Sequence, residues 1–168
     1  MNRPRDVRRR ILVVVESVND WEQLLAWART FINPHDSVLV AMLCEHHGGY
    51  ESDAVPFLSH TDFLQQTERD LRERIRPLLL RLELPFASFR LLEGAANQTV
   101  AELATLWVAE LILTRSELAR RIQGYGGFLG LLAPVPLPCP LLTLSTPPCT
   151  HWTRWLARLQ AWLAQENP

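Results

Sequence analysis

The segment Cys44-Glu45-His46-His47 gathers a thiol, a carboxylate and two imidazoles, which are the side chains that bind zinc. Adjacent histidines do not easily face one ion together, and no distant H-x-x-x-H or C-x-x-C spacing completes a ligand set. We therefore interpret this segment as a loop near a ligand crevice and predict no metal site.

Catalysis by a nucleophile is the second chemistry to consider. Ser17, Cys44 and His46 each follow a predicted strand and would reach one edge of a sheet. They do not form a convincing set of nucleophile, base and acid. We assign no catalytic residue and favour a function other than that of an enzyme, with a hydrolase as the alternative.

The stretch 90–114 has the pattern of a strand, a helix and a second strand. Its first strand ends at Gly94, the helix covers about 97–107 with Asn97 as its N-cap, and an apolar second strand covers 109–114. The helix carries a buried stripe, Val100, Leu103, Ala104 and Trp107. Such a short strand–helix–strand sequence indicates a βαβ unit with parallel strands.

The rest of the chain repeats this unit. With the two strands of this unit, at 88–92 and 109–114, we predict strands at 11–15, 37–44 and 141–145, and further helices at 21–31 and 60–82. Asp20 or Asn19 should cap the first helix and Thr61 or Ser59 the second, where Pro77 predicts either a kink or an end and a restart. The alternating order predicts an α/β fold with a five-stranded parallel doubly wound sheet.

The composition excludes several classes of protein. The 168 residues are 48% hydrophobic, which suits one domain, and the net charge of -1 argues against binding nucleic acid. Every basic residue is an arginine, which excludes a Schiff-base or P-loop lysine. Three separated cysteines fit a reduced protein, and no stretch approaches the length of a transmembrane segment, so we expect a cytoplasmic location.

The two ends of the chain differ from its middle. Residues 1–10 form an arginine-rich tail before an α/β domain at 11–145; a basic arm for lipid or nucleic acid is the less favoured interpretation of this tail. Residues 146–168 predict an added amphipathic helix at about 150–165, with an apolar stripe of Trp152, Trp155, Leu156, Leu159, Trp162 and Leu163. This helix packs either on its own domain or on a protein partner, and two arginines give little support for contact with a membrane surface.

The topology predicts where a ligand would bind. Right-handed crossovers bring the loops that follow parallel strands to one edge of the sheet. A ligand would there meet Glu16, residues 44–47, Gly94 and the loop after Thr114.

Four segments together resemble the universal stress protein family. I-L-V-V-V-E-S-V-N-D resembles its first strand and turn, with Glu16 where Asp is usual, and R-L-L-E-G-A-A-N-Q-T-V-A-E-L-A resembles its third strand, glycine turn and helix. V-A-E-L-I-L-T and P-C-P-L-L-T-L resemble its fourth and closing strands. The resemblance covers most of residues 10–145 and implies a Rossmann-like fold of the adenine nucleotide alpha hydrolase-like type.

The same resemblance implies a place for ATP, but with altered residues. The family's loop G-x2-G-x9-G-[S/T] after the fourth strand brings backbone N–H groups to phosphates. Here Arg115 and Leu118 take the first two glycine positions, and Phe128 follows Gly127 where Ser or Thr is expected. The candidate nucleotide-binding residues are the carboxylate, hydroxyl, guanidinium and glycines of Glu16, Ser17, Arg115, Gly124, Gly126 and Gly127.

Two hypotheses of function follow from this resemblance. The favoured one is a non-catalytic universal stress protein-like regulatory or scaffold module, which acts in the stress response through a homodimer or a protein partner. Family members commonly dimerise through the fifth strand, so the candidate partner-binding residues are Leu141, Leu142 and Leu144 there and Trp152, Trp155, Leu159 and Trp162 in the added helix. The alternative is a protein that binds ATP or AMP through an altered phosphate loop; no cofactor is firmly implied.

Overall fold

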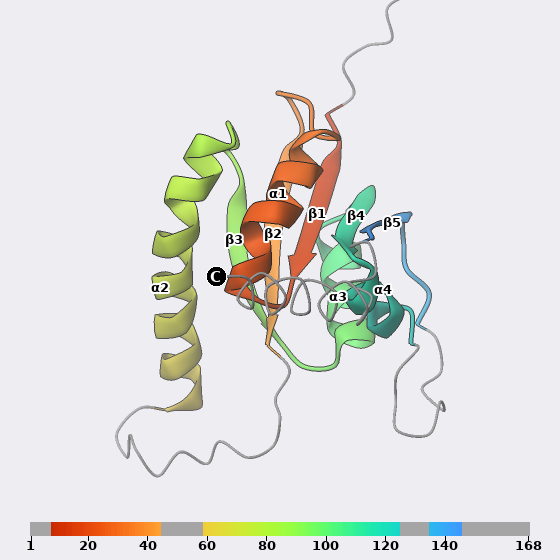
Figure 1. The fold of residues 1–168 in the computed structure, drawn as a ribbon. Coiled ribbons are helices and arrows are strands. Elements are labelled where there is room, and N and C mark those ends of the chain that lie inside the picture. Colours follow the sequence, from red (N-terminus) through yellow and green to blue (C-terminus); the bar gives the residue numbers. More distant parts are fainter. Residues whose placement is uncertain (1–7, 45–58, 125–134, 146–168) are drawn as a thin grey trace, which may run out of the picture.

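A computed structural model describes residues 8–44, 59–124 and 135–145 (Figure 1). Five parallel strands form one sheet in the order β3-β2-β1-β4-β5. They are β1 (Arg10–Val15), β2 (Ser37–Cys44), β3 (Ser88–Glu93), β4 (Leu111–Arg115) and β5 (Leu141–Leu144). The predicted five-stranded parallel α/β fold is confirmed, and the predicted helix at 150–165 lies outside the described residues.

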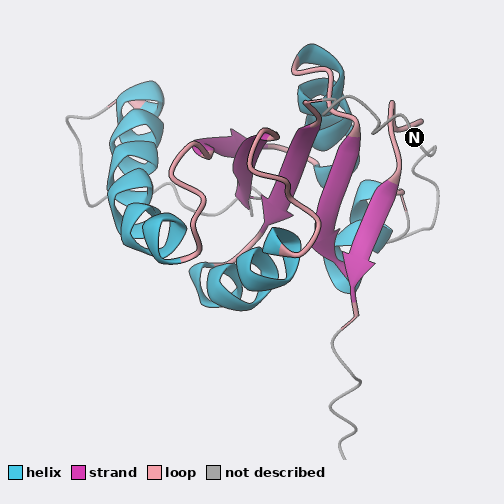
Figure 2. Cartoon of the chain, turned by 90° about the horizontal axis from the view of Figure 1, so that it is seen from above, coloured by secondary structure: helices cyan, strands magenta, loops and turns pink. Residues whose placement is uncertain are grey.

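Helices cover both faces of the sheet (Figure 2). The apolar sides of α1 (Trp21–Arg29) and α2 (His60–Arg81) pack in one core cluster, and those of α3 (Ala96–Leu106) and α4 (Ser116–Ile122) pack in the other. A short 3-10 turn, η1 (Val18–Asp20), joins β1 to α1. Among the described residues, no helix is long and apolar enough to cross a membrane.

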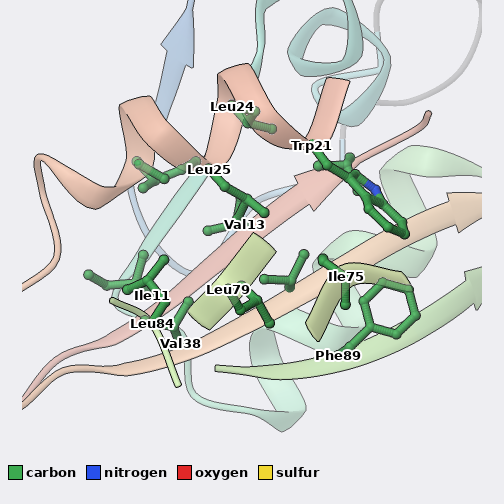
Figure 3. Close-up of a cluster of buried hydrophobic side chains, with 14 of the residues drawn as sticks. Ile11, Val13, Trp21, Leu24, Leu25, Val38, Ile75, Leu79, Leu84 and Phe89 are labelled. Carbon is green, nitrogen blue, oxygen red and sulfur yellow. The ribbon is translucent and has the colours of Figure 1, made fainter. Parts of the chain in front are cut away.

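Strand β1 is the centre of the core because it contributes to both clusters. Ile11, Val13 and Val15 face α1 and α2, while Leu12 and Val14 face α3 and α4, and all five are at most 2% exposed. Figure 3 shows the first cluster, which contains Trp21, Leu24 and Leu25 of α1, Ile75 and Leu79 of α2 and Phe89 of β3. A central parallel strand covered on both faces explains the uninterrupted apolar run in the sequence.

Several predicted element ends are wrong by a few residues. β4 begins at Leu111 rather than 109, and α3 begins at Ala96 with Ala95 as its N-cap, so Asn97 lies inside the helix and is buried. Ser59 caps α2 as predicted, because its Oγ accepts a hydrogen bond from the Asp62 N–H at 3.2 Å. α2 continues through Pro77, so the predicted end and restart is wrong, and the proline removes one backbone N–H from the helix.

Two helices end in the same backbone motif with different residues. After α2, Glu83 has φ 58° and its N–H bonds to Leu80 O, while Leu84 N–H bonds to Leu79 O; after α3, Val108 has φ 55° and the bonds run to Thr105 O and Ala104 O. These are Schellman motifs, which usually place glycine at the left-handed position. At the end of α4 this left-handed position is a glycine, Gly124, at φ 86°. Val108 is β-branched, so its positive φ is a strained conformation.

At the amino edge of the sheet, Asp36, which lies just before β2, binds the segments that precede β1 and β2. Its carboxylate accepts hydrogen bonds from the Arg9 N–H at 3.0 Å, the Arg9 guanidinium at 2.9 Å and the Asn33 N–H at 2.9 Å. The side chain of Asp36 is 1% exposed. Arg8 donates to Ser37 Oγ and Arg10 to Trp107 O, so the last arginines of the predicted tail contact the domain.

Candidate functional site at the carboxyl edge of the sheet

The candidate site lies where the direction of the chain's crossovers reverses. β1 pairs with β2 on one side and with β4 on the other, so the loops after β1 and β4 separate at the carboxyl edge. A buried hydrogen bond from Thr114 Oγ1 to Val14 O, 2.8 Å long, fixes the two strand ends. Ligands of doubly wound proteins bind in the crevice at such a switch point, and Glu16, Ser17 and Arg115 lie there as predicted.

The carboxylate of Glu16 is held by an arginine of the protein itself. It forms an ion pair with Arg121 of α4, and both side chains are about one third exposed, at 34% and 33%. The pair joins the loop after β1 to the helix after β4. Glu16, a candidate nucleotide-binding residue, therefore reaches across the switch point and neutralises the charge of Arg121.

A second ion pair lies beside the first. Arg115 Nη1 is 2.5 Å from Asp20 Oδ1, and Arg115 Nη2 donates to Gln23 Oε1 at the start of α1. Asp20 was predicted to cap α1, but its side chain makes no capping bond among the described residues and pairs with Arg115 instead. The buried Nε–H of Arg115 has no hydrogen-bond partner in the described parts of the chain.

The residues after β4 form a helix and not an extended loop. Arg115 is the last residue of β4, α4 begins at Ser116, and Leu118 is 1% exposed in the core. Leu118, which takes the place of the loop's second glycine, thus packs in the core. The left-handed conformation of Gly124 is accounted for by its place at the end of α4; Gly126 and Gly127 lie outside the described residues.

Ser17 has a local structural role. Its Oγ accepts a hydrogen bond from the Asn19 N–H at 3.2 Å, and its carbonyl accepts one from the Asp20 N–H at 3.1 Å. These bonds form η1 and place Asp20 opposite Arg115. Gly94 makes the corresponding turn after β3, where φ is 129° and an added Cβ would lie 2.7 Å from Thr99 Oγ1.

A smaller polar group lies at the ends of β2 and β3. His60 Nε2 is 2.9 Å from both carboxylate oxygens of Glu93, and burial together with the charge of Glu93 raises the pKa of the Cys44 thiol. A raised pKa favours the thiol over the reactive thiolate. No group of three or more metal-binding side chains occurs in the described residues, while His46 and His47 fall outside them.

The candidate partner-binding residues of β5 differ in exposure. Leu142 is 39% exposed, whereas Leu141 and Leu144 are half-buried and pack against the two core clusters. β5 is an outer strand of the described sheet. The four candidate residues of the added helix, Trp152, Trp155, Leu159 and Trp162, lie outside the described residues.

Sequence reasoning missed the pairing of charges in the candidate site. It identified Glu16 and Arg115, but not that Arg121 would pair with Glu16, or that Asp20 and Gln23 would bind Arg115. The sequence did contain a signal for one pair: Asp20 ends η1 and Arg115 ends β4, and both elements end near the switch point.

Comparison with known proteins yields similarity of structure only. No protein-family model matches the chain, and no curated protein matches its sequence. A universal stress protein family structure from Burkholderia pseudomallei aligns over 84% of this chain and 98% of its own, with a TM-score of 0.55 and 16% identity.

Two similar structures contain adenine nucleotides. A universal stress protein in complex with cAMP covers 83% of this chain and 98% of its own, with a TM-score of 0.51 and 13% identity. A universal stress protein family structure from Arabidopsis thaliana with AMP bound covers 84% and 94%, with a TM-score of 0.51 and 10% identity. With its five-stranded parallel sheet and its helices on both faces, the chain has the fold of the universal stress proteins.

Proposed function

We propose that this chain is a non-catalytic regulatory or scaffold module of the universal stress protein type, which acts through a second copy or a protein partner in the stress response. The observation that supports this proposal is the double ion pair at the switch point. Glu16 and Asp20 neutralise Arg121 and Arg115, the arginines that a bound phosphate would need there. An anionic ligand would have to displace two carboxylates of the protein itself.

A second function, the binding of an adenine nucleotide, is supported by a different observation. The Nε–H of Arg115 is buried without a partner among the described residues, and an oxygen of a phosphate would satisfy it. Two structures of the same fold contain cAMP or AMP. In this alternative the guanidinium of Arg115 holds the anion in place of the glycine loop.

A thermal-shift titration of the full-length protein with ATP, ADP and AMP, with and without magnesium, separates the two functions. A ligand that binds only the folded state raises the melting temperature by mass action. The proposed function predicts no shift at millimolar nucleotide. A saturating shift that Arg115→Gln abolishes would replace it with nucleotide binding.

Partner contact is tested by the state of association. Leu142→Arg places a charge on the exposed side of β5, and Trp155→Ala together with Trp162→Ala removes two aromatic rings from the C-terminal segment. If copies associate through β5 or this segment, at least one variant raises the dissociation constant in analytical ultracentrifugation by about tenfold or more. A wild-type monomer that captures no partner through either surface would contradict the proposed function.

A further inference from the structure

The outer edge of β3 is the second outer edge of the described sheet. β3 pairs with β2 on one side only, and its other side has outward-pointing backbone N–H and C=O groups. Such an edge pairs readily with a strand of another chain, and proteins protect exposed edges by specific devices. In Figures 1 and 2, α2 runs along this edge of the sheet.

Two side chains of α2 bind the outward backbone groups of β3. Arg72 Nη2 donates to Phe89 O at 3.4 Å, and Leu91 N–H donates to Glu68 Oε2 at 3.4 Å. Phe89 and Leu91 are two residues apart, so their backbone groups point the same way. The donor meets the carbonyl and the acceptor meets the N–H, as the backbone of a neighbouring strand would arrange them.

Glu68 and Arg72 are also bound to each other. They are one helical turn apart, and Arg72 Nη2 pairs with Glu68 Oε1, the carboxylate oxygen that Leu91 does not use. The pair is partly exposed, at 28% for Glu68 and 58% for Arg72, and neither residue belongs to the core cluster of α2. One ion pair thus supplies the donor and the acceptor that close this part of the edge.

We propose that Glu68 and Arg72 form a plug that closes the β3 edge to strand pairing with a second copy of this chain. While the plug is in place, an incoming strand has to break two hydrogen bonds and an ion pair before it can pair with Phe89 and Leu91. Once the plug is removed, the Phe89 carbonyl and the Leu91 N–H lose these partners and become available to a strand of a second copy. The β3 edge is therefore an interface that this protein keeps closed.

The test uses the full-length variant Glu68→Ala/Arg72→Ala. At low protein concentration the amide of Leu91 should exchange with solvent about three to ten times faster than in wild type, because its acceptor is gone. At high concentration the variant should associate more strongly than wild type in sedimentation experiments, and the Leu91 amide should become protected again. Unchanged exchange at Leu91, or association that leaves this amide exposed, would overturn the proposal.

Two controls separate the plug from a general effect of charge. Glu68→Gln/Arg72→Gln removes both charges but retains an amide acceptor and an amide donor, so its association should stay close to that of wild type. Glu22→Ala/Arg81→Ala removes another ion pair of α2, at 2.5 Å, which touches no backbone of β3. If either control associates as strongly as the alanine variant of the plug, loss of surface charge is the cause and the proposal fails.

Discussion

The two ends of the central sheet use ion pairs in different ways. At the amino edge, Asp36 is buried and binds the backbone N–H groups of Arg9 and Asn33 as well as the Arg9 guanidinium. At the carboxyl edge, the pairs of Glu16 and Asp20 join side chain to side chain and are partly exposed. The first arrangement binds backbone groups and so fixes the course of the chain, whereas the second joins side chains alone.

The two edges differ in which groups would lose a hydrogen-bond partner if an ion pair were broken. Loss of the Asp36 carboxylate would leave two backbone N–H groups without their acceptor in a site that water reaches poorly, while the Arg9 guanidinium would keep the Phe31 carbonyl. Loss of Glu16 or Asp20 would leave arginines that water can solvate in part. We therefore expect the Asp36 pair at the amino edge to contribute more to stability than the two pairs at the carboxyl edge.

The largest expected effect is that of Asp36→Ala. It should lower the free energy of unfolding by about 2–4 kcal/mol, because it breaks a buried, hydrogen-bonded pair. Urea denaturation followed by circular dichroism measures the change. Glu83→Ala, which removes an exposed partner of Arg29, is the matched control and should cost less than about 1 kcal/mol. Equal losses in the two variants would remove the distinction between the edges.

The pH dependence of stability gives a second test of the amino edge. Burial raises the pKa of Asp36, but hydrogen bonds from Asn33 and Arg9 outweigh it and leave the pKa below its usual value. The stabilisation is therefore complete above the pKa of the unfolded state, about 3.9, and is lost as the pH falls through the lower folded pKa. Denaturation curves should show wild type approaching Asp36→Asn below about pH 4; a constant difference down to pH 2 would contradict this assignment.

The carboxyl edge is tested by a gain of binding. In Glu16→Gln/Asp20→Asn, Arg121 and Arg115 each lose a carboxylate, and the region gains two units of net positive charge. Stability should change by no more than about 1 kcal/mol, while millimolar pyrophosphate or ATP should raise the melting temperature by a few degrees, in contrast to wild type. The variant Glu22→Gln/Glu83→Gln changes the net charge equally elsewhere, and an equal shift in it would mean that binding is non-specific.

The smallest effect concerns the strained helix end near the amino edge. Val108→Gly should raise the free energy of unfolding by about 0.5–1 kcal/mol, because glycine adopts the positive φ without steric cost. The gain is partly offset by the greater freedom of glycine in the unfolded chain. Val108→Ala retains a Cβ and should gain little; urea denaturation of the two variants in parallel distinguishes relief of strain from removal of an exposed apolar side chain.

The sequence alone determined the core and the order of the elements. Apolar runs such as that of β1 are covered on both faces whatever their neighbours are, and helical spacing identifies the buried sides of α1 and α3. Right-handed crossovers then bring Glu16, Gly94 and Arg115 to one edge. These features depend on local pattern and on general rules of connection, so one sequence suffices to predict them.

Only the tertiary structure decided the partners of the charged residues. Arg115 and Asp20 are 95 residues apart in the chain, and Arg121 and Glu16 are 105 apart. An arginine side chain is long and finds an acceptor among many carboxylates and carbonyls, so residue type and spacing do not select one. The same holds for Glu68 and Arg72: their ion pair follows from helical spacing, but their contact with the edge of β3 depends on how α2 packs beside the sheet.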